Sequence, residues 1–207
     1  MSKILIIGDI MLDNYVFGKV NLISPEAPVP ILNFLKNSAK LGGAANVALN
    51  CKKLGMDVTI CGGIGSDENG KKLTKLIKSH KIKKIIVEDK NYKTITKTRF
   101  LHNFSQLLRV DEEIKKFQNN KIKIINRLAK KFNTIVISDY GKGFLNSLGK
   151  NFIKNISKKK KIFVDPKGDD YSKYTGSFLV KPNQKEFFKA TIKFKDKHER
   201  TLAQTLC

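Results

Sequence analysis

Arginine, cysteine and tryptophan are scarce in this chain of 207 residues: only four of its 41 basic residues are arginines, and tryptophan is absent. The three cysteines, Cys51, Cys61 and Cys207, are odd in number and show no CxxC spacing, which argues against a disulfide framework and against a zinc site. The three histidines are widely separated and form no helical pairs, so metal ligation by histidine is not expected. Unpaired thiols fit a reducing cytoplasm.

Long apolar runs are also missing. The N-terminal run, residues 4–7, is followed at once by Gly8 and Asp9, which makes it too short for the core of a signal peptide. No other stretch approaches the length that spans a bilayer. We therefore expect a cytoplasmic protein that has no membrane partner.

The net charge of +23 comes almost entirely from lysine, and asparagine and isoleucine are abundant as well. Specific recognition of bases and phosphates relies on the planar, bidentate guanidinium group, which this chain uses sparingly. The mixture indicates a general drift of composition rather than a selected binding face, so no specific nucleic-acid partner is expected. A basic nucleic-acid binder remains an alternative that the charge alone supports.

Short apolar runs alternate with helical patterns along most of the chain. Runs typical of buried strands occupy residues 3–7, 58–61, 85–87, 134–137, 162–164 and 178–180, and helical patterns occupy residues 44–54, 70–80, 121–132 and, more weakly, 145–156. Strands that alternate with helices predict βαβ units with right-handed crossovers. The expected fold class is α/β, with a mainly parallel sheet, helices on both of its faces and one sizeable core.

Two stretches depart from this alternation. Residues 15–36 and 94–110 contain extended segments without helices between them, and we interpret them as a small accessory β sheet, or lid. After about residue 190 the pattern dissolves into a polar, charged stretch without a further strand. We therefore divide the chain into residues 1–190, the N-terminal part of a single domain that is incomplete at its C-terminus, and residues 191–207, a truncated or divergent tail.

A segment that resembles a phosphate-binding loop runs from Gly65 to Lys72. Lys72 stands where a magnesium-binding hydroxyl belongs, and Asp67 and Glu68 would set two negative charges against a triphosphate. Asp67 is better explained as the N-cap of a helix. The dinucleotide pattern fails too, because Glu68 stands where its third glycine belongs.

Gly42 and Gly43 precede a helical pattern that begins with small residues. Such glycines allow a ligand to approach the backbone, and the free amides of a first helical turn can hold its polar groups; tight packing of the alanines explains the same pattern equally well. Asp13 follows the first strand at the edge where ligands of open α/β sheets collect, and it could also be a loop cap. Residues 138–143 repeat this arrangement after a later strand, with Asp139 and Lys142.

Taken together, these motifs resemble the ribokinase-like (PfkB-type) carbohydrate kinases. The shared segments are Gly8-Asp9 through Asp13, residues 42–46, Gly65 to Gly70, Ser138-Asp139-Tyr140, and Lys181-Pro182-Asn183 with Glu186. Residues 23–30, residues 94–97 with Arg99, and Asp165-Pro166-Lys167-Gly168 are similar to the kinase domain of the bifunctional D-beta-D-heptose 7-phosphate kinase/D-beta-D-heptose 1-phosphate adenylyltransferases.

The resemblance implies a sugar phosphate that lies over the C-terminal edge of the sheet, beneath the β lid, which would also join two copies into a homodimer. By this resemblance, sugar hydroxyls would be bound by Asp13, Gly42, Gly43 and Asn46. The substrate's phosphate would be bound by Lys97, Arg99 and Arg109. Asp139 and Lys142 would lie between the two substrates. Asn183, Gln184, Lys185 and Glu186 would form the nucleotide segment, in which Asn183 and Glu186 act indirectly on Mg²⁺.

The implied reaction is transfer of a phosphoryl group from ATP, with Mg²⁺, to the anomeric hydroxyl of D-glycero-D-manno-heptose 7-phosphate, on the route to ADP-heptose and the lipopolysaccharide core. Family members take their base from a Gly-Ala-Gly-Asp motif, which is absent from residues 1–207. We therefore expect the catalytic base beyond Cys207 and no turnover by this stretch alone. A non-catalytic sugar-phosphate-binding remnant, a subunit of a split kinase, and a kinase for another sugar remain alternatives.

Overall fold

The computed structural model describes residues 2–114, 116–118, 121–158 and 160–191; of the expected tail, residues 191–207, it describes only Thr191, which ends a helix. A central sheet of six strands has the order β10-β9-β8-β1-β4-β5, and all neighbouring strands are parallel. Its strands are β1 (Lys3–Gly8), β4 (Asp57–Gly65), β5 (Lys83–Asp89), β8 (Thr134–Ser138), β9 (Lys161–Asp165) and β10 (Leu179–Val180). The predicted α/β class is confirmed.

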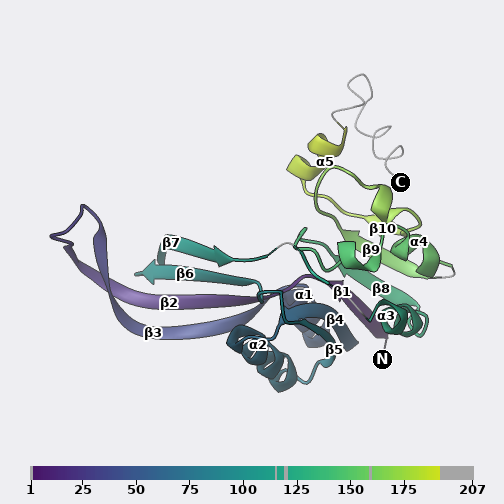
Figure 1. Ribbon diagram of the computed structural model, residues 1–207, viewed down its shortest axis with the longest axis horizontal. Coiled ribbons are helices and arrows are strands. Elements are labelled where there is room, and N and C mark those ends of the chain that lie inside the picture. The colour runs from purple at the N-terminus through teal and green to yellow at the C-terminus, as the bar shows by residue number, and fades with distance from the viewer. Residues whose placement is uncertain (1, 115, 119–120, 159, 192–207) are drawn as a thin grey trace.

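Helices cover both faces of this sheet (Figure 1). On one face, α1 (Ala44–Lys53) and α2 (Glu68–Ser79) pack against Ile4 and Ile6 of β1. On the other, α3 (Ile122–Ala129) and α4 (Phe152–Ile156) pack against Leu5 and Ile7. Successive side chains of a strand point to opposite faces, so an unbroken apolar run serves two cores at once. Full burial of each such side chain contributes about 1.5–3 kcal/mol.

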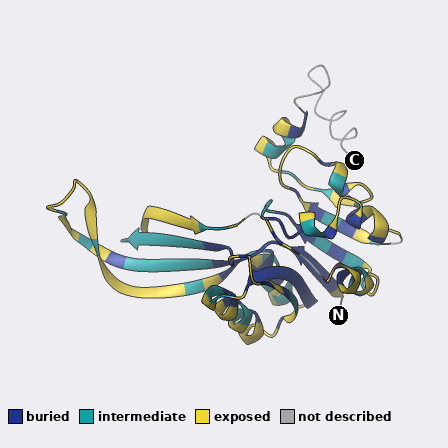
Figure 2. Ribbon diagram, viewed as in Figure 1, coloured by how far each residue is buried: buried dark blue, intermediate teal, exposed yellow. Residues whose placement is uncertain are grey.

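A second sheet of four strands projects from the core as a long arm (Figure 1). Its strands, in the order β3-β2-β6-β7, are β2 (Ile10–Ile23), β3 (Pro30–Gly43), β6 (Thr96–His102) and β7 (Ser105–Glu112). The pair β2–β6 is parallel and the other pairs are antiparallel. This sheet, which we call the lid, contains most of residues 15–36 and 94–110, and its outer part is largely exposed (Figure 2).

The lid joins the core at the C-terminal end of β1. β2 begins two residues after β1, and β3 ends at Gly43, where α1 starts. The amide of Ala44 donates to the Asp9 carbonyl over 3.0 Å, and a Cβ on Gly43, whose φ is +55°, would lie 2.4 Å from that carbonyl. The amide of Leu12 donates to the Ile95 carbonyl, which ties β2 to the start of β6. The lid is therefore anchored where substrates of open α/β sheets collect.

Two local features differ from the sequence prediction. The weak helical pattern over residues 145–156 forms a 3₁₀ turn, η1 (Asn146–Leu148), and the short helix α4, because Gly149 between them has a φ of +88°. A helix that the periodicity did not predict, α5 (Gln184–Thr191), begins after Asn183. A second 3₁₀ turn, η2, covers Ser172–Tyr174. Among the described residues, no helix is both long enough and apolar enough to cross a membrane.

Candidate functional site

Three aspartates line the C-terminal edge of the central sheet, each at the end of one of three neighbouring strands: Asp9 after β1, Asp139 after β8 and Asp165 at the end of β9. The amide of Asp9 donates to the Ser138 carbonyl, and the amide of Asp139 donates to the Asp165 carbonyl. The parallel order therefore brings together residues that are far apart in the sequence.

The Asp9 carboxylate is buried and accepts hydrogen bonds from the amides of Tyr140, Lys142 and Phe144, over 2.9, 3.1 and 3.2 Å. Burial raises the pKa of Asp9, the three amides oppose this, and the nearby charge of Asp139 adds to the rise. Asp9 therefore organises the loop after β8 rather than facing a ligand.

Asp139, predicted to lie between the two substrates, is also buried and fully engaged. Its Oδ2 accepts from the Tyr174 hydroxyl over 2.6 Å and from the Lys173 ammonium over 2.7 Å, and its Oδ1 accepts from the Gly141 amide. Burial and the hydrogen bond to Asp139 raise the pKa of the Tyr174 hydroxyl. The other predicted residue of this loop, Lys142, forms an ion pair with Glu113.

Asp13 lies on β2, a strand of the lid, with its side chain 19% exposed. Its Oδ1 accepts from the Arg99 guanidinium over 2.7 Å. Its Oδ2 faces the backbone of Gly42, where an added Cβ would come within 2.4 Å of that oxygen. Asp13, Gly42 and Gly43 are thus adjacent, and Asn46 is exposed in the first turn of α1. These predicted sugar-binding residues gather at one place.

Lys97 and Arg109 lie on neighbouring lid strands, and both pair with Asp111. Lys97 Nζ lies 2.7 Å from Asp111 Oδ2, and Arg109 approaches both carboxylate oxygens, over 2.8 and 3.0 Å. These pairs lower the pKa of Asp111, that with Lys97 most of all. The structure therefore places two of the three predicted phosphate contacts around one anionic group.

The predicted nucleotide segment starts α5. Asn183 and Glu186 form a reciprocal cap, in which each side chain accepts from the other residue's amide, over 2.9 and 3.1 Å. Glu186 also accepts from Lys167 Nζ over 2.9 Å. Burial alone would raise the pKa of Glu186, but Lys167 and the Asn183 amide outweigh it and lower the pKa. Gln184 and Lys185 are exposed on the same turn.

Magnesium prefers oxygen ligands and usually keeps several waters. Asn183 and Glu186 offer such oxygens, but their hydrogen bonds already engage them. Within the described part of the chain, no three His, Cys, Asp or Glu side chains gather in an arrangement that could hold a metal. With these hydrogen bonds in place, Asn183 and Glu186 could contact a magnesium ion only through bridging water.

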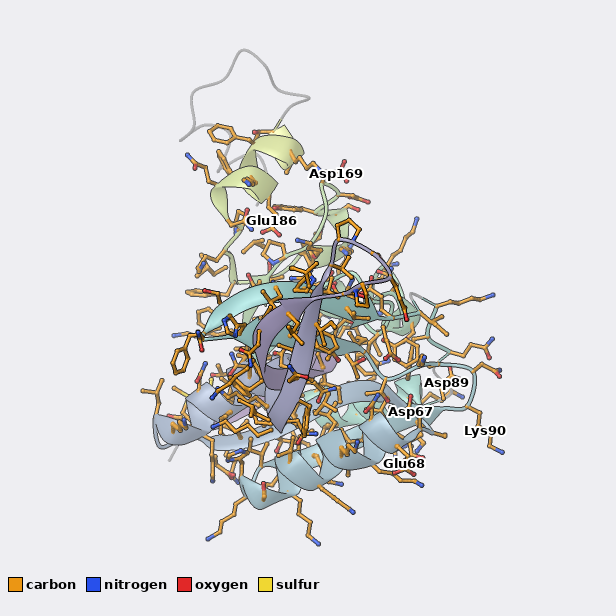
Figure 3. The ribbon with its side chains drawn as sticks, turned by 90° about the vertical axis from the view of Figure 1, so that its left-hand side faces the viewer. Asp67, Glu68, Asp89, Lys90, Asp169 and Glu186 are labelled. Atoms are coloured by element: carbon orange, nitrogen blue, oxygen red, sulfur yellow. The ribbon has the colours of Figure 1, made fainter. Side chains whose placement is uncertain are left out.

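The loops after β8 and β9 enclose a pocket of about 380 Å³, whose lining includes Lys150, Lys167, Asp169 and Lys173. Figure 3 shows Asp169 on the loop after β9 and Glu186 on α5. Lys167 lines this pocket and also pairs with Glu186, so it connects the pocket to the predicted nucleotide segment.

The segment that resembles a phosphate loop has a structural role. Asp67 caps α2: its Oδ1 accepts from the Gly70 amide over 2.7 Å, and its Oδ2 accepts from the Thr94 amide over 2.8 Å. The Thr94 hydroxyl in turn accepts from the Gly65 amide. Figure 3 shows Asp67 well separated from Glu186. The predicted N-cap is confirmed.

Sequence reasoning missed several partners of the predicted residues: Tyr15, Asp111, Glu113 and Tyr174. One of them had a readable signal, because Asp111 follows Arg109 by two positions on a strand and so shares its face. The pairing of Tyr174 with Asp139, 35 positions apart, had none.

Comparison with known proteins gives one family and one fold. The model of the family described as pfkB family carbohydrate kinase matches residues 1–206. Curated relatives include proteins named bifunctional protein HldE, from Sulfurimonas denitrificans (44% identical over 205 residues, covering 94% of this chain and 43% of the relative) and Haemophilus influenzae strain PittEE (42% over 192 residues, 90% and 40%). The chain thus spans about two fifths of the length of these relatives.

Solved structures share the fold at low sequence identity. Phosphofructokinase-2 from Escherichia coli in complex with fructose-6-phosphate superposes with a TM-score of 0.76 at 22% identity, covering 100% of this chain and 70% of that one. Ribokinase from Giardia lamblia has a TM-score of 0.71 at 18% identity, covering 100% and 65%.

Proposed function

Since the chain belongs to the pfkB family of carbohydrate kinases, we propose that it carries the substrate-binding part of an ATP-dependent kinase for D-glycero-D-manno-heptose 7-phosphate, which receives a phosphoryl group at its anomeric hydroxyl. The 1,7-bisphosphate so formed would serve ADP-heptose and lipopolysaccharide core synthesis, in the cytoplasm, where ATP is supplied. One observation carries the proposal: a hydroxyl acceptor, Asp13, and two cations, Lys97 and Arg109, occupy one face of the lid where it meets the sheet edge.

The sugar would lie with its hydroxyls on Asp13 and over Gly42 and Gly43. A carboxylate oxygen accepts sugar hydroxyls well, and the bare backbone at Gly42 leaves room for this carboxylate. Asn46 and the free amides of the first turn of α1 would complete the polar contacts. The lid's Lys97 and Arg109 would bind the 7-phosphate in exchange for Asp111, since an ammonium and a guanidinium suit a phosphate as well as a carboxylate.

ATP would bind beside Asn183, Gln184, Lys185 and Glu186, with Lys167 available to the phosphates. Magnesium, when bound, would neutralise phosphate charge there, through water held by Asn183 and Glu186. The chain's own contribution is alignment of the two substrates and exclusion of water beneath the lid. Lys142 and Lys173 lie on the loops after β8 and β9, where they pair with Glu113 and Asp139.

We further propose that residues 1–207 bind the sugar phosphate without turning it over. Asp139 and Asp9 are buried carboxylates at the edge of the sheet, and each already accepts three hydrogen bonds. Neither is therefore free to accept the hydroxyl proton. This engagement of Asp139 supports a second candidate, a sugar-phosphate-binding protein or a subunit of a split kinase.

The lid also supports a proposed homodimer. The face opposite Lys97 and Arg99 carries Phe100, Leu108 and Val110, because these residues alternate with the basic ones along β6 and β7. Leu108 and Val110 are exposed, and an exposed apolar patch on a sheet suits a second copy of the same chain.

The test is ADP release with ATP, Mg²⁺ and heptose 7-phosphate, measured on residues 1–207 and on a version extended through any downstream kinase segment. Calorimetric binding of the sugar phosphate is measured on both. We expect binding by both forms and turnover by the extended form alone. Normal turnover by residues 1–207 would contradict the proposed need for a further base. Binding and turnover with fructose 6-phosphate or ribose, but not with the heptose, would identify another sugar of the family.

A further inference from the structure

The three cations that the family resemblance assigns to the phosphate fall into two groups on the lid face that carries Asp13. Lys97 and Arg109 share Asp111, whereas Arg99 donates to Asp13 over 2.7 Å. Arg99 follows Lys97 by two positions on the same face of β6 and is in register with Arg109 across β6 and β7. Its nearest anion is nevertheless the carboxylate expected to meet the sugar.

The ring of Tyr15 holds the Arg99 guanidinium in this orientation. Tyr15 is in register with Arg99 across β2 and β6, and its ring centroid lies 5.3 Å from the guanidinium carbon. A second cation, Lys40 from β3, lies 5.0 Å from the same centroid. The hydrogen bond to Asp13, more than any other contact, raises the pKa of Arg99. Stacking and ion pairing together give Arg99 one preferred position.

The Asp13 carboxylate is held asymmetrically as a result. Arg99 engages Oδ1, while Oδ2 lies against Gly42, which has no side chain. We propose that Arg99 is a positioning residue: it orients Asp13 so that Oδ2 accepts a sugar hydroxyl, and it leaves the substrate's phosphate to Lys97 and Arg109. This inference rests on the proposed sugar-phosphate site and reassigns one of the residues that the family resemblance gave to the phosphate.

The test compares a phosphorylated ligand with its unphosphorylated counterpart. Binding of heptose 7-phosphate and of free heptose, titrated to millimolar concentration, is measured by calorimetry on residues 1–207 and on R99Q, D13N, the double variant and K97M. We expect R99Q to weaken both ligands by the same factor, about tenfold, as loss of one charge-assisted hydrogen bond predicts. The double variant should bind no worse than D13N, because both changes remove one contact.

K97M should weaken only the phosphorylated ligand, since Lys97 would face the phosphate. K83M is the matched control, because Lys83 pairs with Asp57 on the core sheet, away from the lid. Y15L should reproduce part of the R99Q effect and Y15F none, since the phenylalanine ring keeps the stacking. Thermal unfolding of each variant shows that it folds, and R99K should recover part of the affinity through its remaining charge.

Three results would overturn the inference. A loss confined to heptose 7-phosphate would make Arg99 a phosphate contact, additive losses for R99Q and D13N would make the two residues independent, and unchanged binding by R99Q would remove any role. In each of these cases the proposed function stands, because the wild-type chain binds. A wild-type chain that binds no sugar phosphate would overturn the proposed function and the role of Arg99 with it.

Discussion

At the scale of single residues, the site depends on carboxylates whose two oxygens have different partners. Asp13 accepts from Arg99 with one oxygen, and its other oxygen lies against Gly42. Asp9 and Asp139 accept hydrogen bonds with both oxygens from the loops that they organise. The same side chain therefore serves binding or architecture according to how many donors surround it.

Gly42→Ala tests the space beside Asp13. Its new Cβ would lie 2.4 Å from Oδ2, and the carboxylate cannot retreat freely because Arg99 holds it. We expect the affinity for the sugar phosphate to fall about tenfold or more, which corresponds to about 1.4 kcal/mol. Gly55→Ala is the control for backbone strain away from the site, since Gly55 has a φ of +84° and nothing lies within 4 Å of its new Cβ. Equal affinity in both variants would mean that the sugar does not use Oδ2.

Asp9→Asn tests the organisation of the loop after β8. The asparagine has one acceptor oxygen in place of two, so at least one buried amide among those of residues 140, 142 and 144 loses its partner. We expect the free energy of unfolding to fall by about 1–3 kcal/mol, measured by urea denaturation. Asp170→Asn, which changes an exposed carboxylate that accepts from Ser172, should have little effect.

At the scale of elements, the connection of α2 to the lid follows from one cap. Asp67 starts α2 and also accepts from Thr94, two residues before β6 begins. A helix of the core and the segment that leads into a lid strand therefore share a carboxylate. The segment from Gly65 to Lys72, which resembles a phosphate-binding loop, thus connects α2 to the start of the lid.

Asp67→Ala should lower the free energy of unfolding by about 1–2 kcal/mol at neutral pH, because it removes a helix cap and the bond to Thr94. Burial alone would raise the pKa of Asp67, but the hydrogen bonds from Thr94 and Gly70 bring it below the ordinary value of 3.8. Because its folded pKa lies below its unfolded pKa, the wild-type carboxylate stabilises the fold above about pH 4. That stability is lost as the pH falls through the folded pKa.

Denaturation curves of the wild type and Asp67→Ala, recorded from pH 2 to pH 7, should therefore converge in acid. Glu68→Gln is the control, since Glu68 is exposed and pairs with Lys71 on the same helix. A difference between wild type and Asp67→Ala that persisted unchanged at pH 2 would show that the carboxylate charge is not the stabilising feature.

At the scale of the whole molecule, a compact α/β core carries an arm whose outer part has few neighbours (Figure 2). Its basic face meets the sheet edge, and its opposite face exposes Leu108 and Val110. Four strands of mixed exposure have little core of their own, so contact with a second copy would stabilise them.

Leu108→Asp should convert a dimer into a monomer, because it places a charge on the proposed interface. The measurement is sedimentation equilibrium over a range of protein concentrations. Leu54→Asp is the control: Leu54 is 76% exposed but lies at the end of α1, in the core domain. A wild-type chain that stays monomeric at all concentrations would contradict the proposed dimer.

The sequence by itself determined the alternating α/β pattern, the position of the lid segments, the cap at Asp67 and the family. Each of these depends on neighbours close in the chain or on motifs of contiguous residues, such as the glycines at 42 and 43. The helix after Asn183 escaped prediction because its pattern is short and its cap involves side-chain bonds that periodicity does not report.

Only the tertiary structure decided which partner each charged residue takes. Arg99 pairs with Asp13 across 86 positions, Asp139 with Tyr174 across 35, and Asp9 with the amides of a loop more than 130 positions away. Strand order and register bring these groups within hydrogen-bonding distance. At that distance the electrostatic interaction between neighbouring groups is strong, and it depends on contacts that the local sequence does not specify.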